Sequence, residues 1–151
     1  MPLFTPFHRL VLAALLLVAG FAAMPARAQD VPDADTQEAI IKETLISFND
    51  ANVTGNYDVL HKKTAAPFEE KFAPADLAEM FKSFPENKID ISPIAGMDPI
   101  EDNPPTVENG ILTLDGHFAT SPLEVNYVLN LVIEEGYWRL IGFDISAKAP
   151  E

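Results

Sequence analysis

Hydrophobic residues in the first half of the chain recur with helical spacing and predict a helix over 36–54. Asp35 with Glu38 three residues later predicts a capping box at its start, and Gly55 predicts its end. The predicted buried stripe is Ile41, Leu45, Phe48 and Asn52. A stripe of this kind indicates a helix that packs on a core with one face.

Shorter helices are predicted to follow. Asn56 is a candidate cap for a helix over 57–63, and Pro67 breaks or restarts it. A further helix should begin at Pro74 and end at Pro85. Its expected apolar stripe is Leu77, Met80, Phe81 and Phe84.

The second half of the chain changes to the alternating pattern of strands. A first strand is predicted over 88–95, whereas 96–109 is rich in prolines and turn residues, which argues against a central strand. Three clear strands follow at 110–119, 124–134 and 137–146. Helices followed by an antiparallel meander predict an α+β domain in which N-terminal helices pack on the concave face of a curved sheet.

The hairpin turns predict a register for these strands. A two-residue turn at Glu135-Gly136 pairs Leu131 with Leu140 and Tyr127 with Asp144, and a tight turn at 121–122 pairs Gly116 with Tyr127. The expected core face then collects Leu112, Leu114, Phe118, Val125, Leu129, Leu131, Ile133, Trp138 and Leu140. Because a slip of one residue would invert a strand, this apolar match supports the register.

Four residues on the expected core face are not ordinary core residues. Gly116 and Gly142 carry no side-chain volume, and they would lie beside the phenol of Tyr127 and the carboxylate of Asp144. This arrangement predicts a concave pocket with a polar floor. The predicted ligand-binding residues are Tyr127, Asp144, Trp138, Gly116, Gly142 and Leu129. Alternatively, the glycines mark bends in the sheet, and Tyr127 and Asp144 satisfy each other.

The opposite face of the expected sheet is too apolar along its last strand to be fully solvated. Its apolar residues are Val128, Ile141, Phe143 and Ile145. A patch of this kind predicts a homodimer that forms through the sheet. The alternative is partial cover by the 96–109 loop.

Residues 1–28 have the pattern of a cleavable signal peptide. Arg9 precedes an uncharged apolar run, and Ala26 and Ala28 fit the small-residue cleavage site. The run is too short for a spanning helix, which needs about 20 apolar residues. We therefore expect cleavage after Ala28, a mature single domain over 29–151, and a periplasmic location without a membrane anchor.

The charge of the chain limits its partners. The formal net charge is −13, and without the signal peptide eight basic residues face 23 acidic ones, which gives −15. Such a chain repels nucleic acid and anionic membranes. There is no cysteine, and His61 and His117 lie on different elements, so no metal site and no cofactor are predicted.

The chain resembles the nuclear transport factor 2-like superfamily over most of 35–147. The resemblance rests on FNDANVTGNY at 48–57, GILTLDGHFATSP at 110–122 and GYWRLIGFDI at 136–145. It implies a cone-shaped α+β fold, a pocket between the helices and the sheet, and frequent dimerisation through the sheet. The superfamily includes enzymes and non-catalytic domains, so the fold alone does not select an activity.

Three functions remain open from the sequence. One is a non-catalytic module that binds a small, mostly apolar ligand against Trp138. Another is a structural or interaction protein whose interior is filled by Phe48, Phe81 and Phe84. The third is a cofactor-free isomerase or hydrolase with Asp144 as general base, Tyr127 as hydrogen-bond donor and His61 as a second acid or base. The sequence contains none of the motifs that would establish an enzyme.

Overall fold

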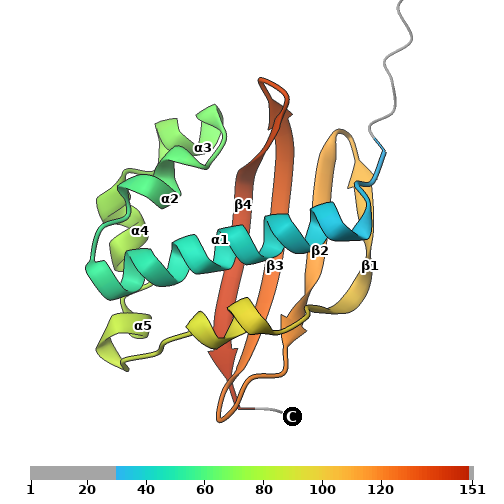
Figure 1. Ribbon diagram of the computed structural model, residues 1–151. Helices are drawn as coiled ribbons and strands as arrows, with labels where there is room; N and C mark the ends of the chain where they lie inside the picture. The colour runs from blue at the N-terminus through green and yellow to red at the C-terminus, as the bar shows by residue number, and fades with distance from the viewer. Residues whose placement is uncertain (1–29, 150–151) are drawn as a thin grey trace, which may run out of the picture.

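The computed structural model describes residues 30–149 and has helices followed by an open, four-stranded antiparallel sheet in the order β1-β2-β3-β4 (Figure 1). The helices are α1 (Ala34–Thr54), α2 (Asp58–Lys62), α3 (Ala66–Lys71), α4 (Pro74–Met80), α5 (Ser83–Glu86) and the 3-10 helix η1 (Ser92–Gly96). The strands are β1 (Ile100–Glu108), β2 (Ile111–Phe118), β3 (Glu124–Glu134) and β4 (Tyr137–Lys148). The α+β class is therefore confirmed, and the predicted signal peptide lies outside the described residues.

Helix α1 begins at a different cap from the predicted one. Asp33 is its N-cap, and Asp33 Oδ1 accepts a hydrogen bond of 2.8 Å from the Thr36 amide. The predicted box of Asp35 and Glu38 is wrong, because the Glu38 carboxylate instead pairs with Lys42 one turn later at 2.6 Å. The predicted end is confirmed: Gly55 has φ 71°, which a residue without a Cβ adopts at no steric cost.

The smaller helices follow the prediction in part. The N-cap of α2 is Tyr57 rather than the predicted Asn56, although Asn56 Oδ1 accepts a hydrogen bond from the Asp58 amide at 2.9 Å just before the helix. Pro85 does not end the helix that Pro74 begins, because α4 already ends at Met80. Pro85 lies instead in the first turn of α5, where its missing N–H needs no helical partner.

The predicted strand over 88–95 is wrong. The Ile91 amide donates to Asn49 Oδ1 of α1 at 2.9 Å, so a helix side chain takes the place of a neighbouring strand. Asp90 Oδ1 accepts from the Ser92 amide at 2.9 Å, which turns the chain into η1. The two alternating isoleucines of this segment therefore belong to the core without forming a strand: Ile91 is buried, and Ile89 packs against the buried cluster.

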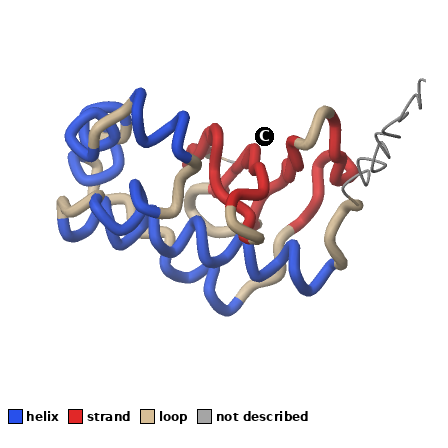
Figure 2. Tube along the Cα trace, turned by 90° about the horizontal axis from the view of Figure 1, so that it is seen from above, coloured by secondary structure: helices blue, strands red, loops and turns tan. Residues whose placement is uncertain are grey.

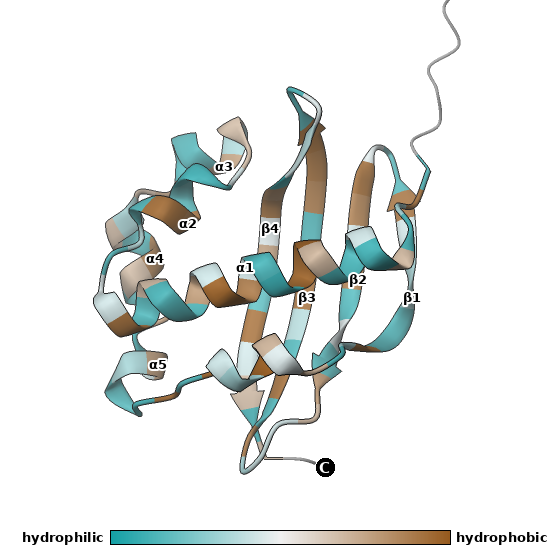
Figure 3. Ribbon diagram, in the orientation of Figure 1, coloured by the Kyte–Doolittle hydropathy of each residue, from teal (hydrophilic) through white to brown (hydrophobic). Residues whose placement is uncertain are grey.

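The segment 96–109, expected to be a turn region, contains the edge strand β1. Pro104 and Pro105 are tolerated because β1 pairs only with β2, and the pairing is irregular around them. Asn109 and Gly110, with φ 52° and 79°, form the two-residue turn that leads into β2. Figure 3 shows that β1 is mostly hydrophilic, as an edge strand protected from further pairing should be.

The predicted register of β2 and β3 is confirmed. Gly116 pairs with Tyr127, and the same alignment holds from Leu112 to Phe118. The two-residue turn at Glu135-Gly136 is also confirmed, with φ 52° and 83°. The connection between β2 and β3 is a loop over 119–123 rather than the tight turn expected at 121–122, but the register and the core face of both strands are those predicted.

The predicted register of β4 is wrong beyond Leu140. Leu140 pairs with Leu131 as expected, but Gly142 is the next residue that pairs, opposite Asn130. Ile141 is an extra residue in a bulge, and the bulge shifts every later residue to the opposite face. Tyr127 consequently pairs with Ile145 rather than with Asp144.

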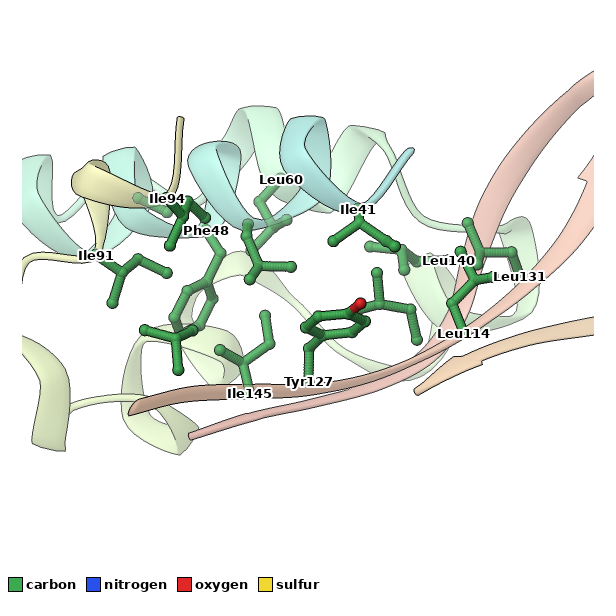
Figure 4. Packing of buried hydrophobic residues seen from close by; sticks show 14 of the residues in the cluster. Ile41, Phe48, Leu60, Ile91, Ile94, Leu114, Tyr127, Leu131, Leu140 and Ile145 are labelled. Atoms are coloured by element: carbon green, nitrogen blue, oxygen red, sulfur yellow. The ribbon is translucent and has the colours of Figure 1, made fainter. Parts of the chain in front are cut away.

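The core lies between the sheet and α1, which crosses one face of the sheet (Figures 1 and 2). The predicted α1 stripe is buried, and so are the predicted core residues of the sheet except Ile133, which is 44% exposed, and Trp138, which is half-buried. Figure 4 shows side chains from α1, η1 and the strands meeting in this layer. Buried side chains from both layers therefore cover the middle of the sheet.

Candidate functional site

Tyr127 and Gly116 meet in the core, as the sequence predicts, but they do not form an open pocket. Tyr127 is 2% exposed, and its ring lies against Phe118 with centroids 5.9 Å apart. A Cβ on Gly116 would overlap the Ile100 carbonyl oxygen and lie 2.6 Å from Tyr127 Oη. The space left by this glycine is thus occupied by the phenol and by the backbone of β1.

Burial raises the pKa of the Tyr127 phenol, and the nearby carboxylates of Glu101, Asp102 and Asp115 raise it further. Because ionising this phenol is unfavourable, Tyr127 stays protonated at neutral pH. Its hydroxyl points into the side-chain layer in Figure 4. The residue therefore acts first as part of the packing of this layer.

Asp144 and Gly142 lie away from Tyr127 because of the β4 bulge. Asp144 is exposed and pairs with Val128. Gly142 pairs with Asn130, and a Cβ there would approach only the Asn130 side chain, at 3.7 Å. Neither the predicted pocket nor the alternative contact between Tyr127 and Asp144 is formed.

His61 belongs to a third location. Its Nε2 lies 2.7 Å from the Phe72 carbonyl oxygen. Since a carbonyl only accepts hydrogen bonds, Nε2 carries the proton and donates it. His61 therefore joins α2 to the end of α3, and the three candidate catalytic side chains Asp144, Tyr127 and His61 do not converge.

The interior next to α1 is filled by aromatic rings. Phe48 meets Phe81 and Phe84 edge-on, each at a centroid distance of 4.8 Å. Phe143 stacks on Phe81 at 5.4 Å and lies 5.7 Å from Phe68. Such pairs add stability beyond the area that they bury.

Two of the four predicted dimer-face residues belong to this interior. Phe143 packs in the aromatic cluster, and Ile145 is only 4% exposed. The cause is the bulge, which moves both side chains to the core face. Val128 and Ile141 are half-buried; Val128 pairs with Asp144, and Ile141 stands with Gly142 opposite Asn130, on the sheet face away from α1. This outer sheet face also carries hydrogen-bonded polar side chains, including Thr113 with Asn130 at 3.0 Å.

The other predicted ligand-binding residues also separate. Leu129 is fully buried in the core. Trp138 lines a cleft of about 300 Å³ between the start of α1 and the β3–β4 hairpin. Two cations border this cleft, but Lys63 is paired with Glu43 at 3.0 Å, and Arg139 donates to the Lys62 carbonyl.

A larger cleft, of about 480 Å³, opens between the segment 87–97 and the β2–β3 loop 119–123. We call it the loop cleft. Its apolar lining includes Ile89, Ile91, Met97, Leu123, Val125 and Ala147. Ile91 and Val125 are each 2% exposed and form part of its floor. The size and lining are those of a small-molecule site.

The walls of the loop cleft are fixed by hydrogen bonds. Asn49, 5% exposed in α1, accepts from the Ile91 amide and donates from Nδ2 to Asp90 Oδ1 at 3.1 Å. On the other wall, the Thr120 hydroxyl donates to the Leu123 carbonyl at 2.5 Å. Both walls are therefore held by hydrogen bonds within the protein.

Two charged side chains lie at the rim of the loop cleft. Hydrogen bonds from the Ser92 amide and the Ser92 hydroxyl lower the pKa of Asp90, and the one from Asn49 lowers it further. Lys88 is exposed and has φ 54°. Asp90 and Lys88 are the charged residues among the described residues that line this cleft.

Sequence reasoning missed the loop cleft entirely. Its walls come from segments that are far apart in the chain, and no local pattern relates them. The one available signal was the polar Asn49 among the apolar residues of the α1 stripe region. A buried amide there needs partners, and those partners are the backbone and side chain of the cleft wall.

Between residues 30 and 149, no cluster of three or more metal-ligating side chains occurs. In the same part of the chain, no helix has both the length and the apolar character that crossing a membrane would require. Compared with protein-family models, curated proteins and solved structures, the chain has no match.

Proposed function

We propose that the protein is an exported, non-catalytic module that binds a small, mostly apolar ligand in the loop cleft. The observation that carries the proposal is the cleft itself, about 480 Å³ in volume with hydrogen-bonded walls and an apolar floor. Apolar pockets of this size with a few fixed polar groups are the usual form of ligand sites. The lining is mostly apolar, which supports binding of an apolar molecule.

The proposal includes a nuclear transport factor 2-like cone with its site displaced. In this interpretation, the helices cover the concave face of the sheet, and the central pocket expected for the superfamily is closed. Tyr127 over Gly116 and the rings around Phe48 support this displacement, because they occupy the middle of the layer. The ligand would then enter at the end of the sheet near Val125 and Ala147.

Filling the loop cleft tests the proposed function. Ala147 is half-buried and lines the cleft, so Ala147→Phe should block it. Ala39→Phe is the matched control, since Ala39 is exposed on α1 and outside the cleft lining. We expect the fluorescence gain of N-phenylnaphthylamine, an apolar probe, to occur with the natural protein and the control but not with Ala147→Phe. Equal gains with all three proteins would refute the assignment.

The exported location is tested separately in a bacterial host. We expect the periplasmic fraction to contain a protein whose N-terminal sequence begins at Gln29, because Ala26 and Ala28 fit the cleavage site. Ala28→Phe should leave the precursor uncut, whereas Ala23→Phe, outside the cleavage positions, should be processed normally. A mature chain that retains residues 1–28 would contradict the proposal. Native mass spectrometry of the periplasmic protein then reveals any ligand that remains bound.

A second function is an interaction protein that forms a homodimer through the outer sheet face. The interior filled by Phe48, Phe81 and Phe84 favours this function, because a protein with a filled interior would interact through its outer surface. Val128 and Ile141 supply half-buried apolar surface on that outer face. An enzyme that uses Asp144 with Tyr127 is not proposed, since β4 pairs Tyr127 with Ile145.

A further inference from the structure

The rim of the loop cleft differs from its apolar floor. Asp90 and Lys88 are its two charged lining residues, and they differ in how firmly they are held. This difference determines which head group a bound molecule would meet in a fixed position. The inference below rests on the proposed function, because it concerns the ligand of the same cleft.

The Asp90 carboxylate is held in place from two sides. Its Oδ1 accepts from the Ser92 amide at 2.9 Å and from Asn49 Nδ2 at 3.1 Å. Asn49 is itself buried and anchored by the Ile91 amide at 2.9 Å. The Ser92 hydroxyl also hydrogen-bonds the Asp90 carboxylate, and the residue is exposed at the rim. The carboxylate is therefore held in one place where a ligand can reach it.

Lys88 is exposed and forms no ion pair with the described residues. Its long side chain would lose much conformational freedom if it were fixed on a ligand. Asp90 would lose less, because hydrogen bonds from Ser92 and Asn49 already restrict its side chain. The formal net charge of −13 also draws cations toward the surface and repels anions.

We infer that the loop cleft binds an amphiphile with an apolar body and a cationic ammonium head, with the body against Val125 and Ala147 and the head at Asp90. Burial of the body supplies most of the affinity. The ammonium head supplies selectivity, because an exposed ion pair contributes only a small part of the binding energy. Added salt should weaken the selectivity without removing the binding.

The test compares octyltrimethylammonium, octanol and octyl sulfate by isothermal titration calorimetry at low salt. We expect the ammonium compound to bind the natural protein more tightly than the sulfate, by about two- to fivefold, as for an exposed ion pair. Asp90→Asn keeps the oxygen that caps Ser92 and removes the charge, so it should abolish this preference. Glu70→Gln removes an equal charge from the exposed face of α3 and should preserve it.

Lys88→Gln tests whether the rim prefers a cationic or an anionic head group. Removing this cation should increase the preference for the ammonium compound, whereas an anion-binding rim would lose its preference for the sulfate. Tighter binding of octyl sulfate, or equal effects of Asp90→Asn and Glu70→Gln, would overturn the inference. If all three compounds bind equally and Ala147→Phe blocks them, only the head-group assignment fails. If none of them binds, the proposed function fails as well.

Discussion

Tyr127 and Gly116 face each other across β3 and β2 so closely that a Cβ on Gly116 would lie 2.6 Å from Tyr127 Oη. The same Cβ would overlap the Ile100 carbonyl oxygen of β1. Glycine at this position therefore lets three strands and a buried ring approach one another. In this sheet the glycine is a packing requirement, and it creates no ligand pocket.

Gly116→Ala should destabilise the protein by about 1–3 kcal/mol, the usual cost of forcing extra volume into a packed core. The added methyl group must displace the backbone of β1 as well as Tyr127. Gly142→Ala is the matched control, because a Cβ there meets nothing closer than 3.7 Å. Urea unfolding measures both variants. Similar midpoints for the two would show that the contact at Gly116 relaxes freely.

Tyr127 should make the protein less stable at alkaline pH. Its pKa is raised in the folded state by burial and by the carboxylates of Glu101, Asp102 and Asp115. Below the usual phenol pKa of about 10, both states are protonated and the contribution is constant. Above it, the unfolded chain loses the proton while the folded chain keeps it, so stability falls as the pH rises.

Thermal unfolding between neutral pH and pH ~11 measures this effect, the upper limit being set just above the usual phenol pKa. Tyr127→Phe should flatten the alkaline decline, although the buried phenol of Tyr57, whose pKa is also raised, keeps part of it. Tyr137→Phe is the control, since Tyr137 is 67% exposed. The comparison uses the slope with pH, because removing the hydroxyl also changes the absolute stability. An unchanged slope in Tyr127→Phe would contradict the expectation.

The alternating pattern predicted β2, β3 and their register because local turns and one buried face determine them together. The pattern failed in β4, where even-numbered and odd-numbered positions both contain apolar residues. Trp138 and Leu140 belong to one parity, and Phe143 and Ile145 belong to the other. We interpreted the second pair as an outer patch. When the apolar residues of one strand switch from even to odd positions, however, the switch also indicates a bulge. Ile141 is the bulge residue.

The candidate site was less predictable than the fold. A pocket at Tyr127 and Asp144 required the register to continue unchanged through Ile141, so one inserted residue removed it. The loop cleft depends on how the segment around Ile91 sits beneath α1, which is decided by the side chain of Asn49. Such a contact, between residues 42 positions apart, leaves no periodic signal in the sequence.

Asn49→Ala should therefore damage the cleft wall as well as the stability. The buried Ile91 amide would lose its acceptor, which costs about 1–3 kcal/mol, and Asp90 would lose a donor. We expect faster hydrogen exchange at the Ile91 amide and weaker binding of the apolar probe. Asn56→Ala is the control, because Asn56 is exposed and outside the cleft lining, and its side chain accepts from the Asp58 amide at the surface. Unchanged exchange at Ile91 would show that Asn49 does not hold this wall.

Substitutions at Phe143 and Val128 test folding and dimerisation separately. Phe143→Glu would place a carboxylate among Phe81 and Phe68, and it should cost more than about 3 kcal/mol. Circular dichroism should then show a largely unfolded chain. A folded Phe143→Glu variant would contradict the position of Phe143 in the interior.

Val128→Lys should fold normally, because Val128 is half-buried on the outer sheet face opposite Asp144. If that face forms the proposed homodimer, an isologous contact brings two such lysines together and disrupts it. Light scattering should then detect a dimer for the natural protein and a monomer for Val128→Lys. Val53→Lys, 66% exposed on α1, is the control and should remain dimeric. A monomeric natural protein would refute the homodimer, and a dimeric Val128→Lys would locate the contact away from Val128.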